Sequence, residues 1–107
     1  MNMIPNQEPN KMIDDQESSK IITDHVAQNP VAIFAKSYCK YSKKTKEYMN
    51  SKGIKFEALD LDRMGSQGVE IQAKLMERTG QSTVPSVWVN GKFIGKIRSC
   101  ILTYQHL

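Results

Sequence analysis

The feature that most constrains the fold is an apolar run, Val31–Ala35, that leads directly into a cysteine-containing segment and then an amphipathic stretch. Several apolar residues in succession, bounded by polar ones, are typical of a strand buried on both faces. Apolar positions at helical spacing then predict a helix from about Tyr41 to Lys52. Cys39 therefore stands where a strand passes into a helix. The unpaired N–H groups and positive dipole end of a helix favour thiolate over thiol at such a position.

The sequence after this helix predicts a second strand and a further helix. Gly53 is expected to end the first of these helices, and Lys55–Leu61 is predicted to be a strand. A helical crossover between two strands makes them parallel, with a right-handed connection. Residues 62–68 are predicted to form a turn, followed by a helix that begins near Val69 and is ended by Gly80.

The N-terminal residues 1–12 are polar and contain two prolines, so a flexible tail is expected there. A helix is predicted to start at Asp14 or Asp15, whose charges suit its positive end, and to finish at Asn29 before Pro30. The tail lacks the apolar core of a secretory signal and the arginines of a mitochondrial presequence, and no run is apolar enough to cross a membrane. A cytoplasmic protein without a membrane partner is therefore expected.

The last clear signal is Asn90-Gly91 between two short apolar stretches, Ser86–Val89 and Lys92–Ile94. It predicts a β-hairpin, because both residues readily adopt the positive φ angles of a two-residue turn. The predicted order is helix, strand, helix, strand, helix and an antiparallel strand pair. We therefore expect one α/β domain over residues 13–107, with a four-stranded mixed sheet flanked by helices in the thioredoxin-like plan.

The cysteine segment is basic, in a chain of net charge +4. Five lysines surround the cysteine with no acidic residue between them: Lys36, Lys40, Lys43, Lys44 and Lys46. Modules that bind nucleic acids usually add interleaved aromatic residues or a recognisable motif, and we identify neither, so no nucleic-acid partner is expected. A solvated helix face is a sufficient explanation for Lys43, Lys44 and Lys46. Lys36 and Lys40 lie nearest the thiol and have the better claim to a functional role. With two cysteines in the chain, a structural zinc site of the four-cysteine or Cys/His type is not expected.

Three motifs resemble the glutaredoxin family in order and spacing: Lys36–Ser42, Thr83-Val84-Pro85 and Val89–Gly95. The resemblance covers about residues 18–95, and the cysteine motif together with Thr-Val-Pro is more specific than either alone. Its Cys-x-x-Ser pattern is similar to the single-thiol variants of the dithiol-type glutaredoxins. It differs from the Cys-Gly-Phe-Ser signature of the main monothiol class.

This resemblance implies a glutathione-dependent thiol-disulfide oxidoreductase that acts on glutathionylated proteins or small disulfides. Cys39 would be the catalytic thiolate and would itself become glutathionylated until a second glutathione releases it. Ser42 cannot form a disulfide within the motif, which leaves the monothiol route, but its hydroxyl can support the thiolate. The proline would be cis, and the backbone before it would pair with glutathione like an added strand. The glutathione-binding residues would be Lys36, Tyr41, Gln72, Thr83, Val84 and Pro85.

The sequence departs from the family beyond Gly95. Residues 96–107 contain no Asp or Glu and replace the second glycine, acidic linker and closing helix of relatives. We therefore expect the closing helix to be missing or replaced, and the grip on the γ-glutamyl end of glutathione to be altered. Cys100 is either an incidental thiol, the interpretation we favour, or a resolving thiol that attacks glutathionylated Cys39.

Two alternatives remain open beside a monomeric enzyme. One is a dimer that binds a [2Fe–2S] cluster, with Cys39 and a glutathione thiolate from each subunit as ligands to the metal. In relatives, cluster binding accompanies loss of the second motif cysteine and absence of a proline beside the first motif cysteine. Here Lys40 occupies the position of that proline. The other is a destabilised isoform that has neither activity.

Overall fold

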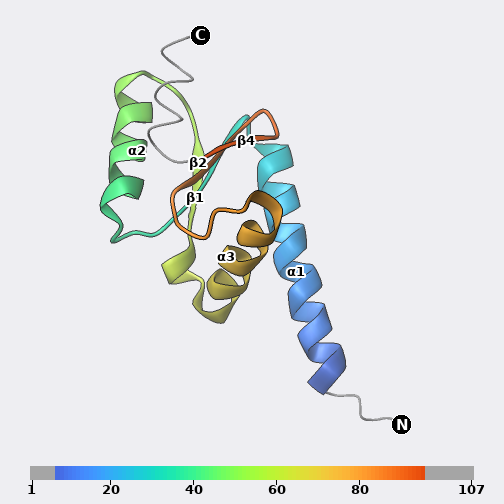
Figure 1. Ribbon diagram of the computed structural model, residues 1–107. Helices are drawn as coiled ribbons and strands as arrows, with labels where there is room; N and C mark the ends of the chain where they lie inside the picture. The colour runs from blue at the N-terminus through green and yellow to red at the C-terminus, as the bar shows by residue number, and fades with distance from the viewer. Residues whose placement is uncertain (1–6, 96–107) are drawn as a thin grey trace.

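The computed structural model describes residues 7–95. Its helices and strands are arranged as three helices around one sheet (Figure 1). In chain order they are α1 (Gln7–Gln28), β1 (Val31–Ala35), α2 (Lys40–Ser51), β2 (Glu57–Asp60), the short 3₁₀ helix η1 (Leu61–Arg63), α3 (Gly65–Thr79), β3 (Ser86–Val89) and β4 (Lys92–Gly95).

The sheet has four strands in the order β2-β1-β3-β4. β1 is parallel to β2, as the helical crossover requires, and antiparallel to β3, while β3 and β4 form the predicted hairpin. At its turn Asn90 and Gly91 have φ values of 50° and 83°, the left-handed conformations that this pair of residues was expected to supply. The mixed four-stranded sheet is thus confirmed.

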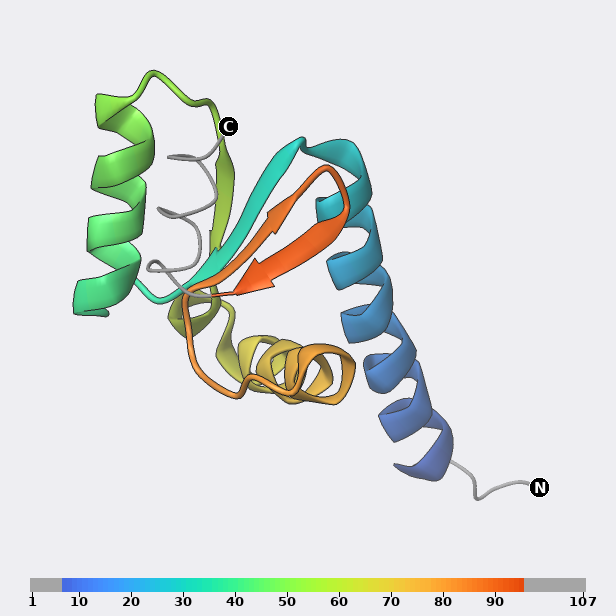
Figure 2. The same cartoon turned by 45° about the horizontal axis from the view of Figure 1, so that its top comes forward.

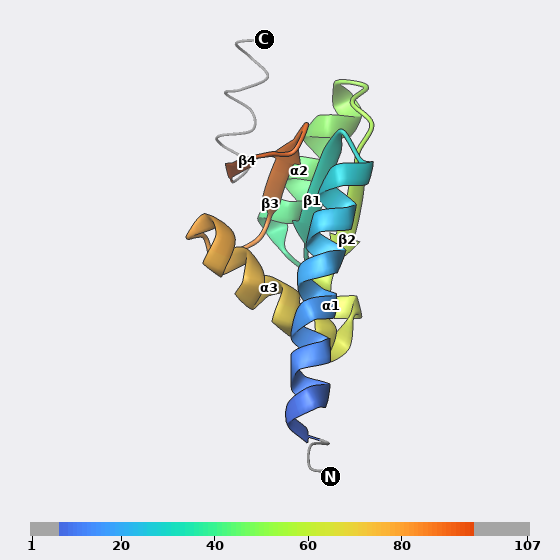
Figure 3. The same ribbon diagram turned by 90° about the vertical axis from the view of Figure 1, so that its right-hand side faces the viewer.

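β1 lies in the centre of the sheet and is buried along its whole length. Because strand side chains alternate between faces, Ile33 packs with Met49 of α2, whereas Phe34 packs with Ile22 of α1 and Leu75 of α3. α2 therefore covers one face of the sheet, and α1 and α3 cover the other (Figures 2 and 3). The buried strand predicted from the apolar run forms the middle layer of this core.

Some element boundaries differ from the prediction. α1 begins at Gln7, so residues 7–12 are helical rather than part of a tail, because Pro9 lies in the first turn, where a backbone N–H needs no helical partner. The first turns of α1 extend beyond the sheet (Figure 3). α3 begins at Gly65, upstream of the predicted start near Val69. The expected tail at 1–6 lies outside the described residues, as does the segment 96–107, which contains Cys100 and where the closing helix was expected to be missing or replaced.

The C-terminal part of α1 is fixed to the sheet through a histidine. His25 Nε2 lies 3.0 Å from the carbonyl oxygen of Glu57, and the imidazole packs edge-on to Phe34 with ring centroids 5.0 Å apart. Burial lowers the pKa of His25 and outweighs the hydrogen bonds and the Glu57 charge that raise it. These contacts give His25 a structural position between α1 and the sheet. Among residues 7–95 no helix has the length and apolar character needed to span a bilayer.

Candidate active site

Cys39 is the N-cap residue of α2, immediately after the loop that follows β1. Its backbone is extended, with φ −81° and ψ 124°, and its carbonyl oxygen accepts the N–H of Lys43 at 3.0 Å. The thiol stands at the end of the helix where the first backbone N–H groups have no helical partner. The predicted junction of strand, thiol and helix is confirmed.

The surroundings of Cys39 favour its ionised form. Burial raises the pKa of the thiol, but hydrogen bonds from the Ser42 hydroxyl and from the backbone N–H groups of Ser42 and Tyr41 oppose this, as does the charge of Lys36. The net effect lowers the pKa of Cys39 below its ordinary value. The thiol is also partly exposed, so a thiolate formed here is accessible to a disulfide.

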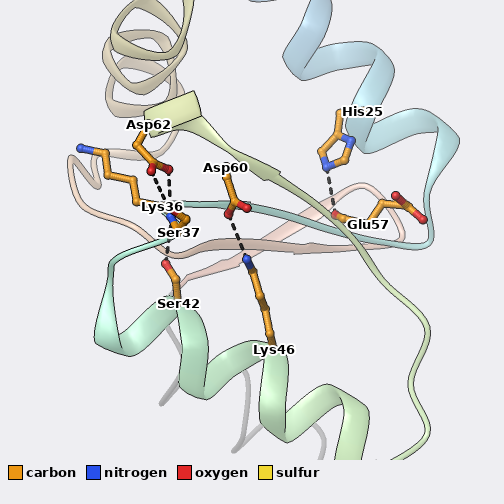
Figure 4. Close-up of polar contacts among 8 residues, drawn as sticks. All are labelled: His25, Lys36, Ser37, Ser42, Lys46, Glu57, Asp60 and Asp62. Carbon is orange, nitrogen blue, oxygen red and sulfur yellow. Dashed lines mark hydrogen bonds and ion pairs between the residues drawn. The ribbon is translucent and has the colours of Figure 1, made fainter. Parts of the chain in front are cut away.

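Ser42 connects the thiol to the preceding loop. Its side chain is fully buried in the first turn of α2. The hydroxyl oxygen accepts the backbone N–H of Lys36 at 3.4 Å (Figure 4). The same hydroxyl lowers the pKa of Cys39 by hydrogen bonding to the thiolate. A serine has both donor and acceptor capacity, so one small side chain serves both contacts.

The loop between β1 and α2 is anchored by an acid that sequence analysis did not identify. The Ser37 N–H donates to Asp62 Oδ1 at 2.8 Å and the Ser37 hydroxyl donates to Asp62 Oδ2 at 2.5 Å (Figure 4). These hydrogen bonds lower the pKa of the Asp62 carboxyl group. Nearby, Lys46 of α2 pairs with Asp60 of β2 at 2.9 Å. The loop before the thiol is thus attached to η1, and α2 after it is attached to the end of β2.

The opposite wall of the site is the segment before β3. The Val84–Pro85 peptide bond is cis, as the family resemblance implied. The Val84 carbonyl oxygen lies 3.8 Å from Cys39 Sγ, which places this backbone beside the thiol. Pro85 is buried and Thr83 is exposed. The structure therefore brings together Cys39 and Val84, which are 45 positions apart in the chain.

Two glutamine side chains hold this wall from the α3 side. Gln81 Nε2 donates to the carbonyl oxygens of Thr83 at 2.8 Å and Pro85 at 2.9 Å, and Gln72 Nε2 donates to Ser82 O at 2.7 Å. The Val84 carbonyl, between the two that Gln81 binds, is directed to Cys39 instead. Sequence analysis did not identify Gln81. The only available signal was a glutamine between the helix-ending Gly80 and the Thr-Val-Pro motif.

The other residues predicted to bind glutathione lie in α2, in the loop before it and in α3. Tyr41 is 57% exposed on the first turn of α2, and Lys36 is half-buried in the loop before Cys39. Gln72 donates one amide hydrogen to the Ser82 carbonyl oxygen, and its side-chain amide has a second N–H donor. The assignment of these residues to glutathione stays a prediction.

We expect Gln81→Met to weaken binding of a peptide-like ligand at Val84. The change keeps a similar length but removes both donors, and each lost hydrogen bond to the loop is worth about 1 kcal/mol. The KM for a glutathionylated peptide should rise severalfold, while the pH dependence of Cys39 alkylation should not move. Gln67→Met is the matched control, because Gln67 bonds Ser18 and has no described bond to this loop. Equal KM changes in both variants would contradict the role of Gln81.

The described donor set does not fit a metal cluster by itself. No group of three or more His, Cys, Asp and Glu side chains within residues 7–95 is arranged to hold a metal ion. A [2Fe–2S] cluster takes about four thiolate or equivalent ligands, and this part of the chain supplies the thiol of Cys39 alone.

Comparison with known proteins places these features in a family. The glutaredoxin family model matches residues 31–94, which contain both Cys39 and the Val84–Pro85 bond. Monothiol glutaredoxin-S10 of Oryza sativa subsp. japonica is 44% identical over 70 residues, which are 65% of this chain and 43% of the relative. Glutaredoxin-C1 of Arabidopsis thaliana is 46% identical over 70 residues, which are 65% of this chain and 55% of the relative. The matches thus span about half the length of these two relatives.

The fold is similar to that of solved glutaredoxins. A buckwheat glutaredoxin–glutathione complex superposes with a TM-score of 0.82 at 31% identity, covering 95% of this chain and 87% of the other. Wheat glutaredoxin gives a TM-score of 0.74 at 38% identity, covering 88% of this chain and 82% of the other. The predicted thioredoxin-like fold is therefore confirmed, and the chain belongs to the glutaredoxin family.

Proposed function

We propose that this protein is a glutathione-dependent thiol-disulfide oxidoreductase that removes glutathione from mixed disulfides by a monothiol mechanism at Cys39. The observation that carries the proposal is the position of Cys39, a partly exposed thiol of lowered pKa at the N-terminus of α2, with the Val84 carbonyl beside it. A thiolate in such a position is a competent nucleophile toward a disulfide sulfur. The family membership supports glutathione as the thiol cosubstrate.

The proposed reaction has two exchange steps. The Cys39 thiolate attacks the glutathione sulfur of a protein–glutathione disulfide, so that the original S–S bond breaks and a Cys39–glutathione disulfide forms. The protein leaves as a thiolate and takes a proton from water. A second glutathione thiolate then attacks the glutathione sulfur on Cys39, which yields oxidised glutathione and regenerates the Cys39 thiolate. Overall, the protein sulfur is reduced to a thiol while one free glutathione is oxidised and joins the glutathione released from the substrate, so electrons balance without another cofactor.

Each site residue has a proposed part in these steps. The Lys36 ammonium would attract a glutathione carboxylate and stabilise the thiolate, and the free amide hydrogen of Gln72 would bind the glycine carboxylate. The backbone of Val84 would pair with that of glutathione like an added strand. Thr83, Pro85 and Tyr41 would form the walls of the cleft around the cysteine.

A single-turnover experiment tests the proposal. The chain is mixed with a glutathionylated peptide in the absence of free glutathione, and mass spectrometry follows the peptide and the protein. We expect the free peptide and a glutathione adduct on Cys39, which added glutathione then releases. Absence of the adduct, or an adduct found on Cys100 alone, would refute the assignment. A brown dimer after anaerobic purification with glutathione, inactive toward the peptide, would favour the cluster-binding alternative.

We predict that Ser42→Ala shifts the acid side of the pH–activity profile to higher pH. Exchange requires the thiolate, so its rate falls as pH drops through the pKa of Cys39, and loss of the Ser42 hydroxyl raises that pKa. The pH dependence of Cys39 alkylation by iodoacetamide measures the shift directly. Ser51→Ala is a matched control in the same helix, because the Ser51 hydroxyl donates only to the Tyr48 carbonyl among the contacts described for it. An unchanged profile in Ser42→Ala would show that the hydroxyl does not support the thiolate.

A further inference from the structure

The first turns of α2, next to the thiol, carry a group of exposed positive charges, and the first acid in the helix is Glu47. Lys40, Lys43 and Lys44 are all exposed and lie in the first turns of the helix, where the first turn contains no acid. Lys46, by contrast, pairs with Asp60 at 2.9 Å. Within residues 7–95, no ion pair is described for the three exposed lysines.

This charge pattern does not favour the helix itself. Positive side chains at a helix N-terminus oppose the macrodipole, for which acidic residues are the stabilising choice. Lysines three and four positions apart on one face also repel each other. Residues that break a local rule of this kind in a folded domain point to a functional reason. Since the lysines begin directly after Cys39, that reason concerns what approaches the thiol.

Two exposed aromatic residues lie on either side of the thiol in the sequence. Tyr38 is 69% exposed and Tyr41 is 57% exposed, and both are large side chains with an apolar ring and a polar hydroxyl. Exposed tyrosines suit a protein–protein contact, because they bury ring area and still satisfy a hydrogen bond. We refer to Tyr38, Lys40, Tyr41, Lys43 and Lys44 together as the basic rim.

We propose that the basic rim binds an acidic polypeptide segment next to the glutathionylated cysteine of a protein substrate. The inference rests on the proposed function and adds a substrate class to it. Lys36 is the lysine whose charge acts on Cys39, and it suits the carboxylate of a small tripeptide. The three exposed lysines continue along α2 away from the thiol. This leaves them available to the part of a mixed disulfide that is protein rather than glutathione.

Paired substrates test this inference. Two glutathionylated peptides of equal length share the central cysteine but carry acidic or basic flanks, and hydroxyethyl disulfide serves as a small substrate. We expect kcat/KM for the acidic peptide to exceed that for the basic one at least about tenfold at low ionic strength, because complementary charge raises the encounter rate. The preference should shrink as salt is added, since exposed charges are screened.

The rim is then neutralised in the triple variant Lys40→Gln/Lys43→Gln/Lys44→Gln. Glutamine has nearly the same helix propensity as lysine, so the change removes charge with little effect on the helix. We expect the acidic peptide to lose most of its advantage, while hydroxyethyl disulfide is reduced at the wild-type rate. The matched control is Lys52→Gln/Lys55→Gln/Lys92→Gln, which removes equal charge from exposed positions outside the rim and should retain the preference.

The outcomes separate the inference from the proposed function. Wild-type activity on hydroxyethyl disulfide with no discrimination between the peptides would overturn the inference alone. If no substrate is reduced, the proposed function fails. Titration with the acidic peptide carrying serine in place of cysteine then still tests the rim through the NMR shifts of α2, and absence of rim-dependent binding overturns it. Tighter rim-dependent binding of a single-stranded oligonucleotide than of the acidic peptide would identify a nucleic-acid surface and overturn it as well.

Discussion

Replacing Cys39 with serine will reduce glutathione transfer to the uncatalysed background. A serine hydroxyl does not ionise near neutral pH and cannot form a disulfide, so the first exchange step loses its nucleophile and the adduct resolved in the second step cannot form. The backbone of Cys39 is extended, as at an N-cap, and serine is a preferred N-cap residue, so serine fits this position without disturbing α2. The loss will therefore be chemical. The rate of release of a glutathionylated peptide measures it, and circular dichroism verifies that the variant is folded.

Cys100→Ser is the control for this prediction. We expect it to retain activity, in agreement with an incidental role for a thiol that lies outside the described residues. An equal loss of activity in the two variants would contradict the assignment of Cys39 as the sole nucleophile and would favour Cys100 as a resolving thiol.

Gly68→Ala will destabilise the fold severely. Gly68 is buried in α3, and a Cβ atom at this position would lie 1.9 Å from the backbone carbonyl oxygen of Leu61 in η1. Overpacking in a core usually costs about 1–3 kcal/mol. Here the added Cβ meets the backbone of Leu61 rather than a flexible side chain, so we expect a cost at or above the top of that range. Chemical denaturation should show a lower free energy of unfolding, or no cooperative transition.

The adjacent residue provides the comparison for Gly68. Val69 is 70% exposed in the same helix, so Val69→Ala should change the free energy of unfolding by less than about 0.5 kcal/mol. Comparable stability of the two variants would mean that α3 does not pack against η1 as closely as the structure has it.

The parts of the fold that sequence predicts well depend on local chemistry. The apolar run at 31–35 forms the buried central strand, Asn90-Gly91 forms the hairpin turn, and Gly80 ends α3 with φ 80°. Each of these signals is contained within a few neighbouring residues. Local backbone preference and hydropathy therefore suffice to predict them, without knowledge of the path of the rest of the chain.

The elements that sequence does not predict depend on contacts between distant segments. Because α3 begins at Gly65, Gly68 lies inside the helix and packs against Leu61 of η1. No local sequence pattern predicts this contact. Likewise, the sequence around Asp62 predicts only a turn. Its role in anchoring the loop depends on Ser37, which is 25 positions earlier in the chain. The role of Gln81 depends on the path of the segment after it. The predicted roles of Lys36 and Gln72 toward glutathione, and the cytoplasmic location, stay predictions.

The dependence of the thiol on contacts made only by the folded chain reverses a familiar relation between unfolding and chemical labelling. Buried cysteines usually become more reactive when a protein unfolds, because they become accessible. Cys39 is already partly accessible, and its lowered pKa requires Ser42 and Lys36 to be held in place. In mildly acidic solution, the native protein should therefore be labelled faster than the denatured one. In a Cys100→Ser background, a slower labelling rate would then serve as a direct optical or mass readout of unfolding.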